Sequence, residues 1–257
     1  SGQGEASNGG EIIALSHGTM KLSQGATVEA KGSTLGGDGG FIDTSGYGRI
    51  ILEDYADASA SNGNAGTWLI DPEFLAIVSG GGGQLDGDTN VSVANGGQSS
   101  SISENFLEGL SGTTNVQLTA GTQITINDLA DNQLLLNDNV SLTLTTNTRD
   151  ILFADPNDSI RVGGTGSLTL DSGRDLYLGT VISAGTGTIS LAVDRNIYDG
   201  NGAAANVVGD ILSFDARDGD VLVSANSPYP SGGSPAGGLD ISGFSQSNPK
   251  VLNLTTN

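Results

Sequence analysis

The residues that could carry out chemistry in this chain are few. His17 is the only histidine and cysteine is absent, so a serine–histidine–aspartate triad could use His17 alone. No thiolate can serve as nucleophile or metal ligand. No serine lies in a segment resembling the nucleophile elbow of α/β-hydrolases. We therefore interpret His17 as a surface or turn residue and expect the protein not to be an enzyme.

Glycan cleavage is the least favoured of the functions considered. Inverting glycoside hydrolases need carboxylates that converge on one sugar bond at a fixed separation. The segment Ser16-His17-Gly18 faintly matches the G-H-G motif of such enzymes on parallel β-helices, but the chain has no D-D pair and no R-I-K segment. An enzyme of this kind would depend on His17.

Three arginines recur at one position of a repeated pattern. Arg149, Arg174 and Arg195 are each followed by an aspartate or asparagine. If successive repeats stack, these side chains lie about 5 Å apart, and the neighbouring acids offset the repulsion. We expect a mixed ladder of charges, and the alternative is a strip that contacts anionic sugars.

No cofactor is expected. Two aspartate-rich segments, 86–88 and 215–220, are candidates for weakly bound calcium, but neither follows the order of ligands in an EF-hand or a nonapeptide calcium repeat. Solvated turns are the simpler interpretation of both.

A repeat of 21 to 26 residues positions these side chains. The same pair of apolar residues around a polar one returns at Val116, Leu142, Leu168, Ile189 and Leu212, with further short alternating segments in between. Alternation indicates strands with one buried face. A sandwich built from hairpins would not need one position to recur, whereas a coil of short strands would. We predict an all-β, right-handed parallel β-helix of about ten coils.

Composition agrees with an aliphatic, turn-rich solenoid. Glycine contributes 41 residues, aromatic residues 5%, and the formal net charge is −20. Such an acidic surface repels nucleic acid and anionic lipid. Neither is expected as a partner.

Two segments interrupt the repeats. The segment 101–104 (SISE), followed by Phe106, Leu107 and Leu110, predicts a capped short helix near 103–110 that closes at Gly112. The proline- and glycine-rich segment 226–238 cannot be a central strand. We expect a protruding loop in which Tyr229 contacts a ligand. The organisation expected is a single β-helix segment over 1–257, cut from a longer protein. It comprises a motif region (1–78), a glycine-rich loop with the helical insertion (79–114) and regular coils (115–257).

Two motifs resemble a known family. Residues 36–46 read GGDGGFIDTSG, and residues 58–72 read ASASNGNAGTWLIDP. In this order and spacing they resemble filamentous-haemagglutinin-like exoproteins, which Gram-negative bacteria export by two-partner (type V) secretion. The resemblance covers roughly residues 10–145. The amino-terminal secretion domain of that family is not present in the sequence.

This resemblance implies a secreted, cell-surface adhesin whose β-helix forms the shaft of an extracellular fibre. Its partners would be proteins or glycans of host cells, other bacteria or matrix, together with an outer-membrane transporter that recognises the absent upstream domain. End-to-end association of rods would also fit. The alternative is a capture module for a host or nutrient protein such as a haem carrier. Independently of the family, the glycines at 36, 37, 39 and 40 predict a tight corner with positive φ, Trp68 is expected to fill the lumen, and Asp71-Pro72 is expected to end a strand.

Overall fold

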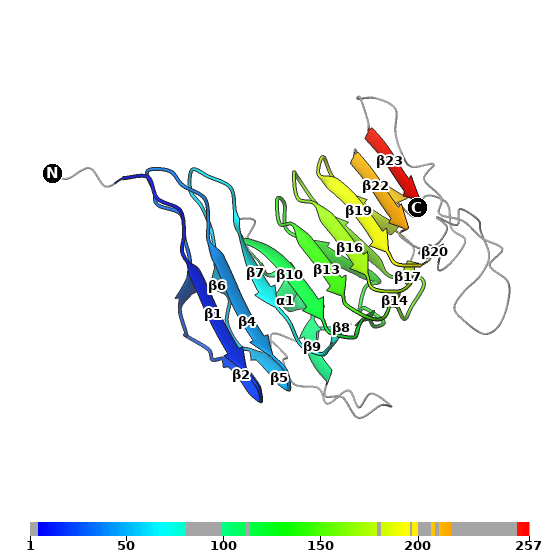
Figure 1. The fold of residues 1–257 in the computed structure, drawn as a ribbon, viewed down its shortest axis with the longest axis horizontal. Helices are drawn as coiled ribbons and strands as arrows, with labels where there is room; N and C mark the ends of the chain where they lie inside the picture. The colour runs from blue at the N-terminus through cyan, green and yellow to red at the C-terminus, as the bar shows by residue number, and fades with distance from the viewer. Residues whose placement is uncertain are drawn as a thin grey trace.

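The chain forms a parallel β-solenoid (Figure 1). The computed structural model describes residues 5–80, 99–110, 114–178, 181–195, 197–199, 207–208, 211–216 and 251–256. Every pairing between the named strands is parallel, and successive coils stack along the axis. The prediction of an all-β parallel solenoid is therefore confirmed.

The first sheet runs the whole length of the solenoid and has nine strands. In stacking order they are β1 (Glu11–Ser16), β4 (Phe41–Gly46), β7 (Gly66–Ile70), β10 (Thr114–Ala120), β13 (Leu142–Thr146), β16 (Leu168–Ser172), β19 (Thr188–Val193), β22 (Ile211–Ala216) and β23 (Val251–Thr256). The strand order follows the chain order throughout.

Two further faces complete each coil. The second face contains β2 (Thr19–Leu22), β5 (Arg49–Leu52), β9 (Ser99–Ser103), β8 (Phe74–Val78), β11 (Gln123–Ile126), β14 (Ile151–Phe153), β17 (Leu176–Leu178) and β20 (Ile197–Asp199). The third face contains β3 (Val28–Glu29), β6 (Ala56–Asp57), α1 (Glu104–Glu108), β12 (Gln133–Leu136), β15 (Ser159–Val162), β18 (Val181–Ala184) and β21 (Val207–Val208). Three strands per coil agree with the short alternating segments of the sequence.

Equivalent residues form columns in the lumen. Leu142 pairs with Leu168, and Leu168 with Ile189, so the repeat found in the sequence is the register of the first sheet. All three side chains are fully buried. Each aliphatic side chain packs on its equivalents in the coils on either side, and this packing replaces water along the axis.

The number of coils is smaller than predicted. The described strands complete about six turns, not about ten. Two long connections separate paired strands of the first sheet. The prediction had assigned much of the first to a glycine-rich loop with a helical insertion (79–114), and the second to regular coils with a loop at 226–238. Thr67 pairs with Asn115 across the first, and Leu212 pairs with Leu252 across the second.

The first long connection changes the strand order on the second face. Strand β9 follows β8 in the chain but lies between β5 and β8 in the stack (Figure 1). It pairs with β8 through the backbone, whereas Ile50 of β5 donates its N–H to the Ser100 hydroxyl at 3.1 Å. Between β5 and β9, a hydrogen bond to a serine side chain thus takes the place of the backbone hydrogen bonds that join β9 to β8.

Helix α1 closes the third face beside the inserted strand. The capping signature predicted at 101–104 is confirmed, and its Ser103 is the cap, which accepts the Phe106 N–H at 3.2 Å. The helix ends at Gly109, however, and not at Gly112. A Cβ atom at Gly109 would lie 2.3 Å from the Tyr55 hydroxyl, so a larger residue here would have to displace the end of the Tyr55 side chain. The Tyr55 and Phe106 rings stack with centroids 4.6 Å apart.

Trp68 fills the lumen, as predicted. Its ring is fully buried and its Nε1–H donates to the Thr44 hydroxyl at 2.8 Å. The glycine corner is only partly as expected. Gly36 and Gly37 have positive φ, but Gly39 and Gly40 do not. A Cβ atom at Gly39 would lie 1.8 Å from the Ala58 carbonyl oxygen, so this glycine permits close approach of two coils.

Candidate functional site

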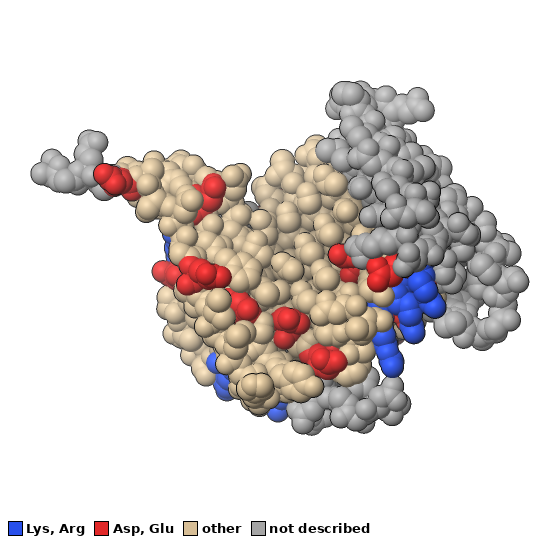
Figure 2. Space-filling model, viewed as in Figure 1, with Lys and Arg blue, Asp and Glu red and all other residues tan. Residues whose placement is uncertain are grey.

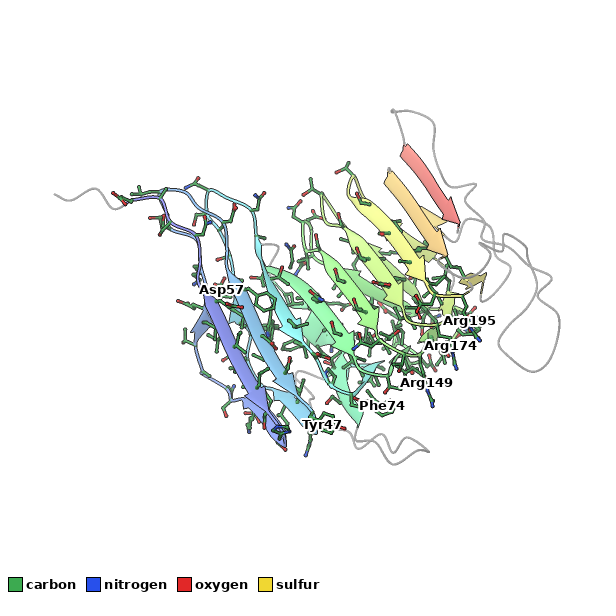
Figure 3. The ribbon with its side chains drawn as sticks, in the orientation of Figure 1. Tyr47, Asp57, Phe74, Arg149, Arg174 and Arg195 are labelled. Carbon is green, nitrogen blue, oxygen red and sulfur yellow. The ribbon has the colours of Figure 1, made fainter. Side chains whose placement is uncertain are left out.

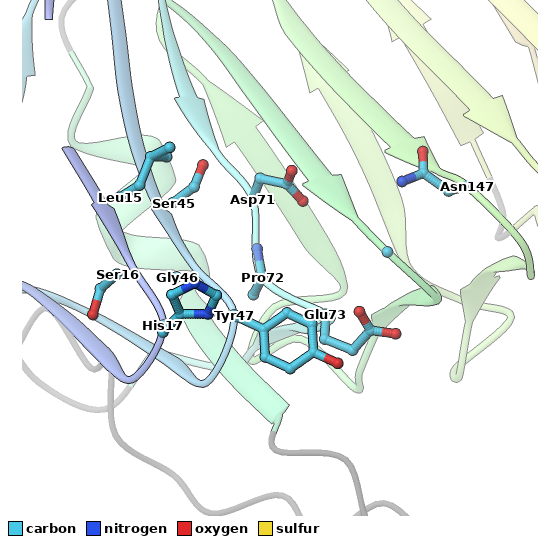
Figure 4. Close-up of a pocket in the computed structure, with 11 residues that line it drawn as sticks. Leu15, Ser16, His17, Ser45, Gly46, Tyr47, Asp71, Pro72, Glu73 and Asn147 are labelled. Atoms are coloured by element: carbon cyan, nitrogen blue, oxygen red, sulfur yellow. The ribbon is translucent and has the colours of Figure 1, made fainter. Parts of the chain in front are cut away.

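A groove crosses several coils where the chain leaves the first sheet for the second face (Figure 4). The cavity has a volume of about 420 Å³. Its lining comes from the ends of β1, β4, β7, β10 and β13 and includes Leu15, His17, Tyr47, Asp71, Glu73 and Asn147. We call this set of residues and the space between them the corner groove.

Small residues at the turn keep the corner groove open. Gly46, Pro72 and Gly121 line it at successive coils. The space beside Gly121 is already occupied by Glu73, because a Cβ atom there would lie 2.5 Å from the Glu73 carboxylate. Strand β7 ends at Ile70, as Asp71-Pro72 predicted, so the acidic residues follow the strand directly.

The electrostatics of the corner groove are acidic. Burial, and then the charges of Asp43 and Glu73, together raise the pKa of the Asp71 carboxyl group to about 6. Asp43 accepts a hydrogen bond from the Ser45 hydroxyl, and Glu73 accepts one from the Thr122 hydroxyl. Among the described residues, no ion pair involves Asp43, Asp71 or Glu73. The site therefore carries negative charge that no basic side chain of this part of the chain neutralises.

An exposed aromatic ring lies beside these carboxylates. The Tyr47 side chain is 73% exposed. Figure 4 shows His17, Tyr47 and Glu73 following one another across successive coils. The pairing of Ser16 with Gly46 makes His17 and Tyr47 equivalent residues of adjacent coils. The Tyr47 ring, the Glu73 carboxylate and the Asn147 amide together suit the groove to binding a polar ligand.

His17 is exposed in a turn of the corner groove, as the sequence analysis expected. It makes no hydrogen bond with another described residue. The general base of a triad must lie within hydrogen-bond reach of both its nucleophile and an orienting acid. That arrangement is not formed around His17 in the described part of the chain.

The predicted arginine ladder forms along the same corner, farther along the axis. Figure 3 shows Arg149, Arg174 and Arg195 one after another. Arg174 Nε donates to Asp150 Oδ1 at 2.7 Å, and Arg195 Nε donates to Asp175 Oδ1 at 3.3 Å. In both pairs a second guanidinium nitrogen contacts the other carboxylate oxygen. Arg174 and Arg195 thus each bind the aspartate of the preceding coil.

These ion pairs limit what the ladder can bind. Asp150 and Asp175 are buried, and guanidinium groups compensate their charges: Arg174 for Asp150, and both Arg195 and the more distant Arg174 Nε, at 3.9 Å, for Asp175. The pKa values of Arg174 and Arg195 are raised, and the largest cause is the hydrogen bond that each guanidinium donates to its aspartate. The exposed Arg149 makes no ion pair within the described residues, because the preceding coil has Gln123 at the aspartate position. Contact with an anionic sugar therefore stays a prediction, with Arg149 as its freest group.

Charge is unevenly distributed along the solenoid. Figure 2 shows acidic side chains spread across the face in view and basic side chains gathered near the C-terminal end of the described coils. Figure 3 places the three ladder arginines in that region. A ligand lying along the corner would meet opposite charges at its two ends.

A second acidic group lies where the second face meets the third. Carboxylate oxygens of Asp128, Asp155 and Asp158 lie within 4.8 Å of one another. Asp158 is fully buried and accepts the Leu129 N–H at 3.3 Å. Burial, and then the charges of Asp155, Asp128 and Glu104, raise the pKa of Asp158 to about 7. Protonation of Asp158 reduces the repulsion among the three carboxyl groups.

Several predicted contacts lie outside the described residues. These are Tyr229 with the segment 226–238, the first calcium candidate at 86–88, and most of the second at 215–220. The sequence analysis missed both the corner groove and the acidic group at Asp158. Aligning the repeats would have found the latter, because Ile126 pairs with Phe153 and places Asp128 beside Asp155. The corner groove had a weaker signal, which is the position of Tyr47 and Glu73 directly after strand ends.

Within the described residues, no helix is both long and apolar enough to span a bilayer. No family model, curated protein or solved structure matches the chain.

Proposed function

We propose that this chain is a structural and adhesive module, a shaft segment of a secreted filamentous-haemagglutinin-like exoprotein on the surface of a Gram-negative bacterium. The motifs at residues 36–46 and 58–72 support the family, the two-partner secretion route and the location. On this proposal, an upstream domain engages the outer-membrane transporter. The described coils present a ligand-binding side surface.

The observation that carries the proposal is the in-register stacking of the first sheet. Its nine strands are all parallel, and equivalent residues occupy equivalent positions from coil to coil. A solenoid of this kind is stiff along its axis and extends by repetition. It also offers long side surfaces, and the corner groove shows that one of these is hollowed.

Attachment of coated beads tests the proposal. Beads carrying the purified chain are expected to adhere to host cells, bacteria or matrix more than beads carrying an unrelated acidic β-solenoid of similar length. Deletion of 226–238 is expected to reduce adhesion and to leave the circular dichroism spectrum unchanged. Equal adhesion of both kinds of bead would reject the adhesive function, and full adhesion after the deletion would reject the role of Tyr229.

The corner groove also favours the alternative of a capture module for one host or nutrient protein. Capture predicts a single saturable partner from serum or matrix extract. Adhesion predicts weak contacts with many surfaces. Isothermal titration with the recovered protein separates them, because only capture gives a defined stoichiometry.

A further inference from the structure

We propose that the corner groove binds cationic side chains, those of lysine or arginine in an extended segment of a protein partner. This inference stands on the geometry of the groove. It holds whether or not the chain mediates adhesion.

Charge complementarity is the first argument. Asp43, Asp71 and Glu73 influence one another electrostatically, and within the described residues none has a basic partner. Farther along the same corner, by contrast, Asp150 is paired with Arg174. An ammonium or guanidinium group from another molecule would supply the missing charge, and charge-assisted hydrogen bonds are the stronger kind.

The exposed apolar side chains beside the carboxylates form the second argument. Tyr47 is 73% exposed and makes no ring contact with another described aromatic residue. Its face is available to a cation, which aromatic rings attract through their quadrupole. Leu15, which is 68% exposed, lies at the same end of the groove. It would pack against the methylene groups of a lysine or arginine stem.

The length of the groove indicates an extended ligand. Its lining runs from His17 in the first coil to Asn147 in the fifth. At about 4.8 Å between paired strands, this is roughly 19 Å along the axis. An extended peptide of about six residues covers that distance at about 3.3 Å per residue. The Asn147 amide and the Ser16 and Ser45 hydroxyls line the path and can bond to a peptide backbone.

A neutral glycan fits these features less well. A sugar ring could stack on Tyr47, and its hydroxyls could donate hydrogen bonds to the carboxylates. It would nevertheless bring no positive charge to offset the charges of Asp71 and Glu73 as water is displaced, which costs binding free energy. The cationic peptide satisfies the ring and the carboxylates together.

Fluorescence anisotropy with a labelled hexa-arginine peptide tests the proposal. The double variant Asp71→Asn, Glu73→Gln is expected to weaken binding by about tenfold, the effect of losing about 1.4 kcal/mol of interaction. The control variant Glu11→Gln, Asp138→Asn removes the same charge from exposed positions away from the groove lining, and is expected to weaken binding by less than about twofold. Urea unfolding of each variant verifies that the fold is retained.

Tyrosine variants test the ring separately. Tyr47→Ala is expected to weaken binding by about threefold, and Tyr47→Phe is expected to restore it, because cation attraction uses the ring face. An equal loss in both double variants would mean that only net charge attracts the peptide. That result, an absence of hexa-arginine binding, or tighter binding of a neutral chito-oligosaccharide would each overturn the proposal.

Discussion

Replacement of Asp158 by asparagine is expected to stabilise the protein at neutral and alkaline pH. The native state holds this carboxyl group with a pKa of about 7, against a usual value of 3.8. Below pH 3.8 both states are protonated. Between the two values the native state keeps the proton that the unfolded state loses, so stability falls as pH rises and the full cost is present above about pH 7.

The size of the effect follows from the same shift. A rise from 3.8 to about 7 corresponds to a ceiling of about 4 kcal/mol at 1.36 kcal/mol per pH unit. Local relaxation reduces this, so we expect Asp158→Asn to raise the free energy of unfolding by about 1 to 3 kcal/mol at about pH 8. Asparagine Oδ1 can still accept the Leu129 N–H, so the hydrogen bond at this site is retained.

Urea unfolding of both proteins at about pH 4 and about pH 8, with excess EDTA, measures the difference. The advantage of the variant should be near zero at the lower pH and should grow as pH rises. Asp138→Asn, at an exposed position, is the control and should show no such growth. A variant that is equally stable relative to wild type at both pH values, or less stable at the higher one, would refute the argument.

Two further predictions concern the coil edges. Arg195→Ala should lower the free energy of unfolding by about 1 kcal/mol, since it removes the closer of the two guanidinium groups beside the buried Asp175, whereas Arg149→Ala should change it by less than about 0.5 kcal/mol. Equal effects in urea titrations would contradict the ladder. Gly39→Ala should destabilise the protein by more than about 2 kcal/mol, because its Cβ would overlap the next coil, whereas Gly10→Ala has open space and should be neutral. A thermal melt of both variants checks this, and a tolerated Gly39→Ala would show that the coils can separate there.

The sequence was sufficient to predict the columns of the first sheet. Leu142, Leu168 and Ile189 begin the same alternating pattern, and alternation fixes which side chains face the lumen. The arginine ladder was predictable for the same reason, because a position that recurs in the repeat becomes a line on the surface. The prediction that acidic residues offset the arginine charges is also confirmed for two of the three arginines, because Arg174 binds Asp150 and Arg195 binds Asp175.

Other features depend on contacts that the repeat does not encode. Residues 99–103 read SSSIS, which has no apolar alternation, so the place of β9 in the stack could not be found from hydrophobicity. Gly39 is required by the close approach of Ala58, and Gly109 lies against Tyr55, both of which are distant in sequence. The corner groove likewise arises from side chains of different coils that meet only when the register is known.

The place of β9 also has a consequence for the order in which the molecule can assemble. During synthesis from the amino terminus, β5 and β8 are both complete before β9 exists. The place of β9 between them must therefore stay unfilled until residue 99 and the following residues have been synthesised. The first two coils therefore cannot template the third by simple zippering on this face. On this face, the stack between β5 and β8 can be completed only after residues 99–103 have been synthesised.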